Sequence, residues 1–440
     1  MSSASQDDLG KGQVRYPVNV LLLSDYYPPV DGGTARHVFL LAHALKEKGH
    51  DVVVLTSARQ RGTGEEITEE EGVEVIRYEG IFQRMSFLFR NATLKHNPPI
   101  QDPMIARKLE KLIVEKSPEI IHSHGWILYS GLFSAKKFNV PIVSTLHDFN
   151  LICPKKVLAN ECGICDQAFS NRCILCGKSS YGNRTGVIKS AFAYLGVRLN
   201  RTSIRKVNKF IAVSSFVKRL YLKHLPLNPD DIVVLPNFVE LPNSIRKSDH
   251  DVVKKSPSDG ELPDDFILFV GALGHHKGVG ILIDAFRQVN TRTKLVLVGN
   301  PEPGHNYKSF ENVLFFKNVP REFVEEALSK CRFLVVPSTT PETFSIVALE
   351  AMSYGKAVIA TDHGGITEFV RHKQTGYLVP PRDSKTLADA ISYMLKNSVS
   401  ERLGEKGYAE YKSHFSKEKV LPSVEAFYTG VVTDQNRSRD

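Results

Sequence analysis

Long apolar runs are missing from this sequence. No stretch approaches the roughly 18 consecutive apolar residues of a transmembrane helix, and the first sixteen residues are polar and lack the apolar segment of a secretory signal. These absences predict a cytoplasmic protein with a disordered N-terminal tail. They leave peripheral contact with the inner face of the membrane open.

The chain also has no motif for binding RNA or DNA, and its net charge is not high enough to indicate such binding without a motif. The formal net charge is +9 and the pI is near 9.0, which suits anionic ligands or membrane surfaces but is too mild to indicate nucleic acid by itself. We therefore expect no nucleic-acid partner. The 440 residues, of which 42% are apolar and 24% charged, have the composition of a globular chain with two or three domains.

Apolar runs of strand length alternate with amphipathic stretches along almost the whole chain, which is the pattern of parallel α/β sheets. Two helices are indicated by apolar residues at helical spacing, one within 38–45 and one within 105–113. The pattern restarts after the polar stretch 247–264, so it predicts two doubly wound, Rossmann-like domains facing each other across a cleft. The expected strands are 18–23, 52–55, 73–76, 120–121, 142–146, 210–213, 267–270, 295–298, 313–316, 333–336 and 357–360.

Two carboxylates flank the start of one expected helix. The strand 333–336 is followed by the loop 337–341 and by Glu342. An apolar helical stretch, 344–352, then carries Glu350 about two turns further on. A helix N-terminus after a parallel strand is a place where α/β proteins bind phosphate-bearing ligands. Ionised carboxylates there suit ribose or hexose hydroxyls, since they are strong acceptors. The alternative is an exposed loop acid and a solvated helix face.

A Gly32-Gly33 pair lies between the first expected strand and the first helix, where backbone can approach a ligand closely. The pair belongs neither to a G-x-G-x-x-G nor to a Walker loop, so a nicotinamide or ATP ligand has little support. A plain tight turn before the helix is the alternative. Gly271 and Gly299 each end a strand in the second half, where a glycine also needs no ligand to explain it.

The stretch from Glu342 onward resembles the donor-binding signature of retaining glycosyltransferases of the family-4 type (group 1), which have the GT-B fold. The matching parts are the pair Glu342 and Glu350 with seven residues between them, Glu350-Ala351-Met352, the stretch 355–360, and the loop 364–368. The resemblance is highly specific over residues 265–382 and looser from residue 17 almost to the C-terminus. It implies an N-terminal acceptor-side domain at 17–227, a nucleotide-sugar donor domain at 228–420, and a C-terminal helix at 421–440 that crosses back to the first domain.

The resemblance also implies roles for residues that match the family's motifs. Glu342 contacts the transferred sugar and Glu350 the nucleotide ribose, while Lys277 meets the pyrophosphate. His147, which follows the strand 142–146, matches the strand-end His that contacts the donor sugar; His122 and His124 are expected to be packed residues and His37 receives little weight. Backbone that binds the donor is expected at Gly32, Gly33, Gly271, Gly299, Phe344 and Ser345.

The implied activity is transfer of a sugar from a UDP- or GDP-linked donor to an acceptor hydroxyl, with retained configuration and no cofactor required for catalysis. The acceptor is a sugar, a lipid-linked molecule or another small molecule. Ala272 stands where the family has an Arg that donates to phosphate, and its loss should weaken leaving-group stabilisation. His275, His276 or an Arg of the first domain could replace that Arg. Two rivals remain open: a catalytically weak or dead nucleotide-sugar-binding scaffold, and a nucleotide-sugar epimerase, for which we find no acid/base pattern.

Five of the six cysteines lie between Cys153 and Cys176. Two C-x2-C pairs, Cys162 with Cys165 and Cys173 with Cys176, have the spacing of a small zinc knuckle. An iron–sulfur cluster, disulfides and free thiols are the alternatives. Cys153 is left over as a packing residue or a spare ligand. We expect this segment, 153–176, to be an insertion that shapes the acceptor pocket.

The segment 81–90 mixes aromatic, aliphatic and basic residues. Such a segment can dock a protein on an anionic bilayer or on a lipid-linked acceptor. The alternative is a core-facing helix with a solvated basic edge. This segment is therefore the sequence's candidate for peripheral membrane contact.

Overall fold

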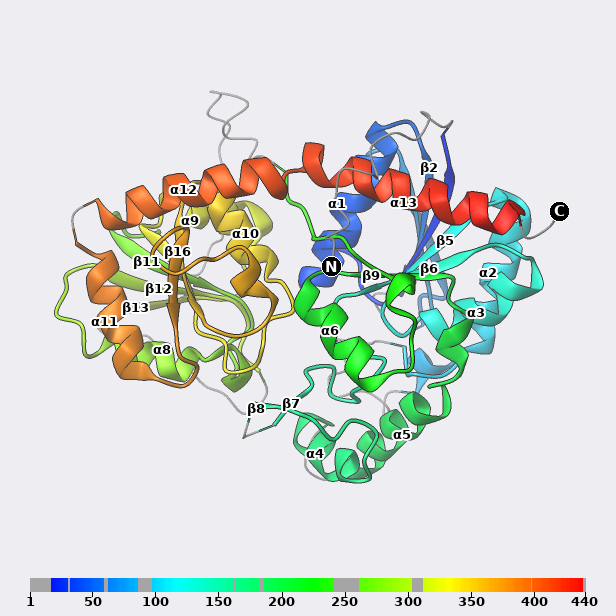
Figure 1. Ribbon diagram of the computed structural model, residues 1–440, viewed down its shortest axis with the longest axis horizontal. Helices are drawn as coiled ribbons and strands as arrows, with labels where there is room; N and C mark the ends of the chain where they lie inside the picture. The colour runs from blue at the N-terminus through cyan, green and yellow to red at the C-terminus, as the bar shows by residue number, and fades with distance from the viewer. Residues whose placement is uncertain are drawn as a thin grey trace, which may run out of the picture. The chain divides into compact units, whose positions relative to one another are not determined.

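The computed structural model describes residues 17–30, 32–58, 62–85, 97–160, 163–181, 186–240, 261–302, 312–396 and 398–437. The chain forms two compact units. The first unit consists of Met1–Pro236 together with Val420–Asp440, and the second consists of Asn237–Lys419. Figure 1 shows that each unit contains a sheet of its own with helices packed against it.

The first unit is built on an eight-stranded sheet in the order β10-β9-β6-β5-β1-β2-β4-β3. Its strands run parallel except β3, which is antiparallel to β4. The chain moves outward from β1 in one direction and from β5 in the other, so the loops after β1 and β5 flank a crevice where doubly wound sheets bind ligands. The strands are β1 (Asn19–Ser24), β2 (Asp51–Ser57), β3 (Glu65–Glu70), β4 (Val73–Tyr78), β5 (Ile120–His124), β6 (Ile142–Leu146), β9 (Lys209–Ala212) and β10 (Ile232–Val234).

Helices cover both faces of this sheet: α1 packs on β1 and β2, and α3 on β5 and β6 (Figure 1). The sequence fixes some of their ends. Asp102 caps α2 by accepting hydrogen bonds from the amides of Met104 (2.9 Å) and Ile105 (3.2 Å), with a proline at the first helical position. The helices are α1 (Gly33–Glu47), α2 (Pro103–Lys116), α3 (Leu128–Lys137), α4 (Arg172–Tyr181), α5 (Gly186–Leu199), α6 (Ser215–His224) and α13 (Lys417–Arg437). A short hairpin, β7 (Ala159–Asn160) with β8 (Gly163–Ile164), precedes α4.

The second unit is a parallel six-stranded sheet in the order β13-β12-β11-β14-β15-β16. Here the direction of winding changes between β11 and β14, so the loops after these strands flank the ligand-binding crevice of this sheet. Almost all residues of the central strands are fully buried. The strands are β11 (Phe266–Val270), β12 (Lys294–Val298), β13 (Val313–Phe316), β14 (Phe333–Val336), β15 (Ala357–Thr361) and β16 (Gly376–Val379).

Two layers of helices enclose the second sheet. Helices α8 and α11 pack on each other along one face, and α9, α10 and α12 lie along the other (Figure 1). Of the described helices, none has the length and apolar content that a membrane span requires. The helices are α8 (Val279–Phe286), α9 (Arg321–Lys330), α10 (Ile346–Ser353), α11 (Ser384–Met394) and α12 (Val399–His414).

The structure differs from the sequence-based expectation at the end of the first unit. Strand β10 pairs with β9, so the first unit extends to Pro236, past the boundary at residue 227 that the sequence predicts. Helix α10 also begins later than expected, at Ile346. Ser345, the N-cap residue, has a φ of 78°, so its backbone is not helical. Phe344 lies before the helix, and its ring packs against Phe369 with centroids 5.0 Å apart.

Candidate functional site

Two loops at the switch point of the second sheet are tied together by hydrogen bonds. The loop after β11 contains a short 3-10 helix, η6 (His275–Lys277), and the loop after β14 contains Thr339. The Thr339 amide donates to the His276 carbonyl (2.9 Å), and its hydroxyl donates to the His275 carbonyl (3.0 Å). The two loops therefore hold each other in place at the carboxyl end of the sheet.

This arrangement brings Lys277 and Glu342 together. The Lys277 ammonium lies 2.7 Å from Glu342 Oε1, and the Ser338 hydroxyl donates to the same oxygen. Burial by itself would raise the pKa of Glu342, but the Lys277 charge and these hydrogen bonds hold it below its ordinary value. The carboxylate is therefore ionised at neutral pH. The Lys277 side chain remains 32% exposed, so its ammonium has room for an anionic ligand.

Gly364 and Gly365 hold the Glu342 loop from the other side. The Gly365 amide donates to the Glu342 carbonyl (2.6 Å). Gly364 has a φ of 90°, and a Cβ there would lie 2.2 Å from the Glu342 carbonyl oxygen. The glycine pair of the signature is thus required by the close approach of two backbones beside Glu342.

We predict that Gly364→Val lowers both stability and turnover. The side chain would need a strained backbone and would push the Glu342 loop outward, at a cost of about 1–3 kcal/mol in the free energy of unfolding. Chemical denaturation and steady-state rates measure the two effects. The matched control is Gly280→Val, since a Cβ at Gly280 meets nothing within 4 Å. Unchanged stability and rate in Gly364→Val would contradict this account of the loop.

Glu350 is buried and is held by an arginine that sequence reasoning missed. Arg321, at the start of α9, contacts both carboxylate oxygens, with Nη1 3.3 Å from Oε2 and Nη2 bonded to Oε1. Burial by itself would lower the pKa of Arg321, but the Glu350 carboxylate, with Glu325, raises it above its ordinary value. The bidentate pair fixes the plane of a carboxylate that is only 5% exposed. No pattern in the sequence pairs these two residues, because they come from neighbouring helices.

The expected donor-binding glycines lie next to each other at the ends of β11 and β12. Gly299 has a φ of 147°, and a Cβ there would meet the Gly271 carbonyl oxygen at 1.9 Å. Packing of the two loops therefore explains why glycine is needed at 299. Ala272 is exposed, so its methyl group leaves open space at the position where the family resemblance implies an arginine. The buried ring of Phe344 leaves its backbone as the part available to a ligand.

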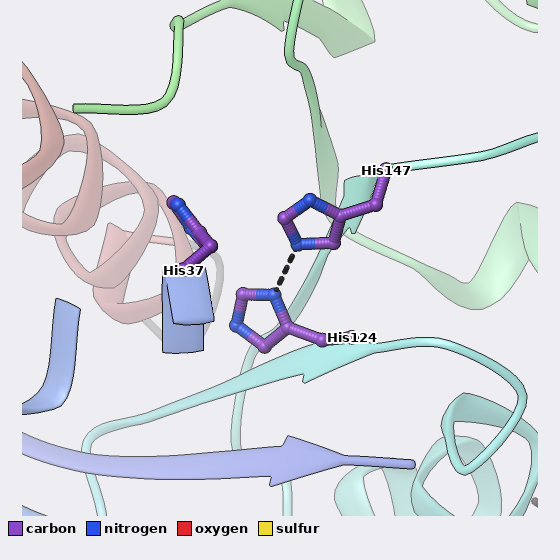
Figure 2. A group of neighbouring side chains, drawn as sticks. All are labelled: His37, His124 and His147. Atoms are coloured by element: carbon purple, nitrogen blue, oxygen red, sulfur yellow. Dashed lines mark hydrogen bonds between the residues drawn. The ribbon is translucent and has the colours of Figure 1, made fainter. Parts of the chain in front are cut away.

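In the first unit, three histidines meet at the switch point of the sheet (Figure 2). His124 ends β5 and His147 follows β6; their rings are joined by a hydrogen bond between Nδ1 and Nε2 (2.9 Å). His37 of α1 lies beside His147, with ring centroids 4.8 Å apart. Burial lowers the pKa of His37 to about 4 and also places the pKa values of His124 and His147 well below the ordinary value. All three rings are therefore neutral at pH 7.

The three imidazole rings are the described group of side chains that could hold a metal ion. One ring nitrogen of each lies within 4.8 Å of those of the other two. A nitrogen of His124 and one of His147 hydrogen-bond each other directly. His122 lies behind them and uses both nitrogens, on Tyr428 (2.6 Å) and Thr145 (2.7 Å). The arrangement is a packed imidazole cluster that presents His147, which is partly exposed, to a ligand.

The loop after β1 contributes Gly32 and Gly33, which are exposed at the N-terminus of α1. Asp25 lies under this loop and is almost fully buried. Its carboxylate accepts from the amides of Trp126 (2.7 Å) and Ile127 (3.0 Å), so it ties the loop after β1 to the loop after β5. His147 and Asp148 line a narrow pocket in the first unit together with Asp25 and Lys156.

The cysteine segment forms the short β7–β8 hairpin and α4, and α4 carries Cys173 and Cys176. The described thiols Cys153, Cys165, Cys173 and Cys176 are free, while Cys162 lies outside the described residues. Burial raises the pKa of Cys173, and Cys165 and Cys176 raise it further. Cys331 is a separate buried thiol in the second unit.

The aromatic-basic segment 81–90 is described only as far as Met85. Residues 82–84 form a 3-10 helix, η2 (Phe82–Arg84), and Phe82 packs near Phe192 of α5 with ring centroids 6.4 Å apart. Ile81 is 41% exposed. Residues 86–90 lie outside the described part of the chain.

Comparisons with known proteins identify the family of this chain. The family model "Glycosyl transferases group 1" matches residues 254–410, and "Glycosyltransferase Family 4" matches residues 31–242. Glycogen synthase of Mycobacterium tuberculosis (strain CDC 1551 / Oshkosh) is 25% identical over 93% of this chain and 94% of its own length. Phosphatidyl-myo-inositol mannosyltransferase of Mycobacterium leprae is 23% identical over 94% of this chain and 98% of its own length.

Solved structures show the same fold. Sucrose-phosphate synthase of Thermosynechococcus elongatus superposes with a TM-score of 0.68 at 21% identity, covering 96% of this chain and 100% of that one. Anabaena HepE in complex with UDP-glucose gives a TM-score of 0.61 at 18% identity over 93% and 99% of the two chains. The two sheets, the Glu342–Glu350 signature and the two family matches lead to one conclusion: this chain is a GT-B protein that belongs to the family-4 type of glycosyltransferases.

Proposed function

We propose that this glycosyltransferase transfers a hexose-type sugar from a UDP- or GDP-linked donor to an acceptor hydroxyl with retention of configuration. The observation that carries the proposal is the Lys277–Glu342 ion pair at the switch point of the second sheet. A cation and an ionised carboxylate at one place suit a ligand with a diphosphate on one side and sugar hydroxyls on the other. The carboxylate of Glu350, held by Arg321, accepts hydrogen bonds from the ribose hydroxyls.

In this mechanism the bond between the anomeric carbon and the diphosphate oxygen breaks, and the acceptor oxygen bonds to the same face of that carbon. Lys277 and the amides of the Glu342 loop stabilise the negative charge that develops on the diphosphate. Glu342 and His147 position the sugar, and the neutral imidazole of His147 suits a hydroxyl group. The acceptor proton passes to the departing phosphate oxygen. No protein nucleophile and no cofactor is needed.

A weak or inactive scaffold is the second candidate, and the exposed Ala272 is the observation that favours it. An epimerase is the third candidate. A panel of UDP- and GDP-sugars separates them. For the proposed enzyme, one donor raises the melting temperature and is slowly hydrolysed, releasing its nucleoside diphosphate. A scaffold would be stabilised without hydrolysis, and an epimerase would return an isomerised donor. A panel in which no nucleotide sugar binds would remove the proposal.

We also propose that Cys162, Cys165, Cys173 and Cys176 hold a structural zinc ion, on the strength of their two C-x2-C pairs. Metal analysis of reductively purified protein should find about one zinc ion per chain. Removing it should loosen residues 162–176 in hydrogen exchange, since thiolates without a cation repel one another, and should reduce acceptor transfer while donor binding persists. A metal-free preparation with free thiols and full transfer would contradict this proposal.

The acceptor remains a sugar, a lipid-linked molecule or another small molecule. The relatives differ here, because glycogen synthase and phosphatidyl-myo-inositol mannosyltransferase are named for unlike acceptors. Peripheral contact of this chain with a cytoplasmic membrane face would favour a lipid-linked acceptor. A sedimentation assay with lipid vesicles tests this membrane contact directly.

A further inference from the structure

Exposed apolar side chains are concentrated on one pair of helices. In the described part of the chain, eleven large apolar side chains are exposed, and six of them lie between residues 164 and 199. Helices α4 and α5, which pack on each other at one edge of the first unit (Figure 1), carry five of these six. Scattered single exposures are ordinary, but a cluster of this kind marks an interaction surface.

On α5 three of the four exposed large apolar residues share one face. Ile188, Leu195 and Leu199 have exposed fractions of 70%, 50% and 72%, and their spacing of seven and four residues places them along a single stripe. The opposite side of the helix carries the buried residues Ala193 and Val197. Helix α5 is thus apolar toward the core and apolar toward solvent. We call Ile188, Leu195 and Leu199, with Leu175 of α4 (71% exposed), the α5 surface.

Basic residues flank this surface. Residues 167–229 contain twelve Lys or Arg residues and no Asp or Glu. The formal charge of this stretch is therefore larger than the net charge of +9 of the whole chain. Lys189 and Arg198 lie on either side of the apolar stripe in the helical register. Arg201 and Arg205 follow the helix and are exposed. An apolar stripe with basic flanks has the composition of a helix that lies in the interface of an anionic bilayer.

The surface continues toward the segment that the sequence singled out. Phe192 of α5 packs near Phe82, and the neighbouring Ile81 and Met85 are 41% and 37% exposed. The side chain of Asn200 donates to the Pro99 carbonyl (2.9 Å), which anchors the end of α5 to the first unit. The helix that presents the apolar side chains is therefore held to the rest of the first unit by these contacts.

We propose that the α5 surface docks this protein on an anionic phospholipid bilayer, with Ile188, Leu195 and Leu199 inserted among the headgroups and the flanking basic residues on the lipid phosphates. A second copy of the chain is a poorer occupant, because a symmetric contact would bring two basic surfaces together. Nucleic acid is poorer too, since single-stranded bases stack on aromatic side chains and the stripe is aliphatic. The link to a lipid-linked acceptor rests on the proposed function, whereas docking itself does not.

Vesicle sedimentation of the full chain, without any substrate, tests the proposal. Vesicles of phosphatidylcholine with phosphatidylglycerol should bind the protein at least about tenfold more tightly than phosphatidylcholine alone, and high salt should weaken the binding.

The double variant Ile188→Glu with Leu199→Glu should lose at least about tenfold in partitioning. Arg201→Ser with Arg205→Ser should lose about fivefold for each charge. The matched control is Val114→Glu on α2, an exposed apolar position (65%) away from the α5 surface.

Each contrary result overturns the proposal in a recognisable way. Absence of binding to anionic vesicles removes it. Binding that depends on the arginines but survives the Ile188→Glu and Leu199→Glu changes would show a general polyanion surface. A wild-type dimer that the same apolar variants dissociate, with vesicle binding unchanged, would assign the surface to a second copy. Because these positions are exposed, the variants should keep the wild-type melting temperature, which checks that the first unit remains folded.

Discussion

Lys277→Ala should lower the rate of sugar transfer by about 100-fold while the protein remains folded. Its ammonium is the cation that the structure places 2.7 Å from Glu342, and position 272, where the family resemblance implies a second cation, is Ala272 here. With no second cation at position 272, the charge that develops on the departing diphosphate loses a direct electrostatic partner, which typically costs about 2.7–4 kcal/mol in the transition state. Steady-state and single-turnover rates measure the loss.

Two further variants make this result specific. Lys277→Arg keeps the charge and should retain more activity than Lys277→Ala. Lys330→Ala removes a lysine that pairs with Glu326 on the surface of α9, and should leave the rate unchanged. Ala272→Arg introduces the residue that the family resemblance implies at this position and should be neutral or activating. If Lys277→Ala transfers sugar at the wild-type rate, the ion pair is structural and the assignment of the leaving-group site is wrong.

The second large effect is expected at Glu350. Glu350→Ala should weaken binding of the nucleoside diphosphate by about 10- to 100-fold, since hydrogen bonds from ribose hydroxyls to a carboxylate are charge-assisted. Glu342→Gln should instead lower turnover with little change in donor affinity, because the reacting sugar is contacted most strongly in the transition state. Calorimetry with UDP and GDP, beside steady-state kinetics, separates the two effects.

Arg321→Met should mimic part of the Glu350→Ala effect. It leaves a carboxylate that is 5% exposed without its bidentate partner, which we expect to lower stability by about 1–3 kcal/mol and to weaken nucleotide binding. Glu325→Ala is the matched control, because it removes the other carboxylate on Arg321 and leaves the Glu350 contact in place. Equal nucleotide affinity in Glu350→Ala and wild type would show that Glu350 does not hold the ribose.

Most of the fold could be predicted from the sequence because the central strands are continuous apolar runs. Strands β6, β13 and β14 have the predicted bounds. The missed strands lie at sheet edges. Strand β3, with the sequence EEITEE, is half-exposed and antiparallel, so its pattern resembles a charged loop. Strands β10 and β16 are short. Because β10 was not predicted, the predicted boundary of the first unit came too early in the chain.

The candidate site was less accessible to sequence reasoning. The family signature located Glu342, Glu350 and Lys277, but the contacts of Glu350 depend on how α9 packs beside α10, and no local pattern encodes that. The same holds for Asp25, whose side chain bonds to the loop after a strand about a hundred residues away. The glycines are a further example, since Gly364 is required by the backbone of Glu342.

The stereochemistry of the product tests the central claim most directly. The full chain is incubated with the α-linked donor that the panel selects, and the anomeric proton of the first product is followed by NMR before mutarotation. We predict that the sugar appears in the α configuration and that one nucleoside diphosphate is released for each sugar transferred or hydrolysed. A β-configured first product would contradict retention, and an epimerised nucleotide sugar with no transfer would show that this family member is not a glycosyl-transferring enzyme.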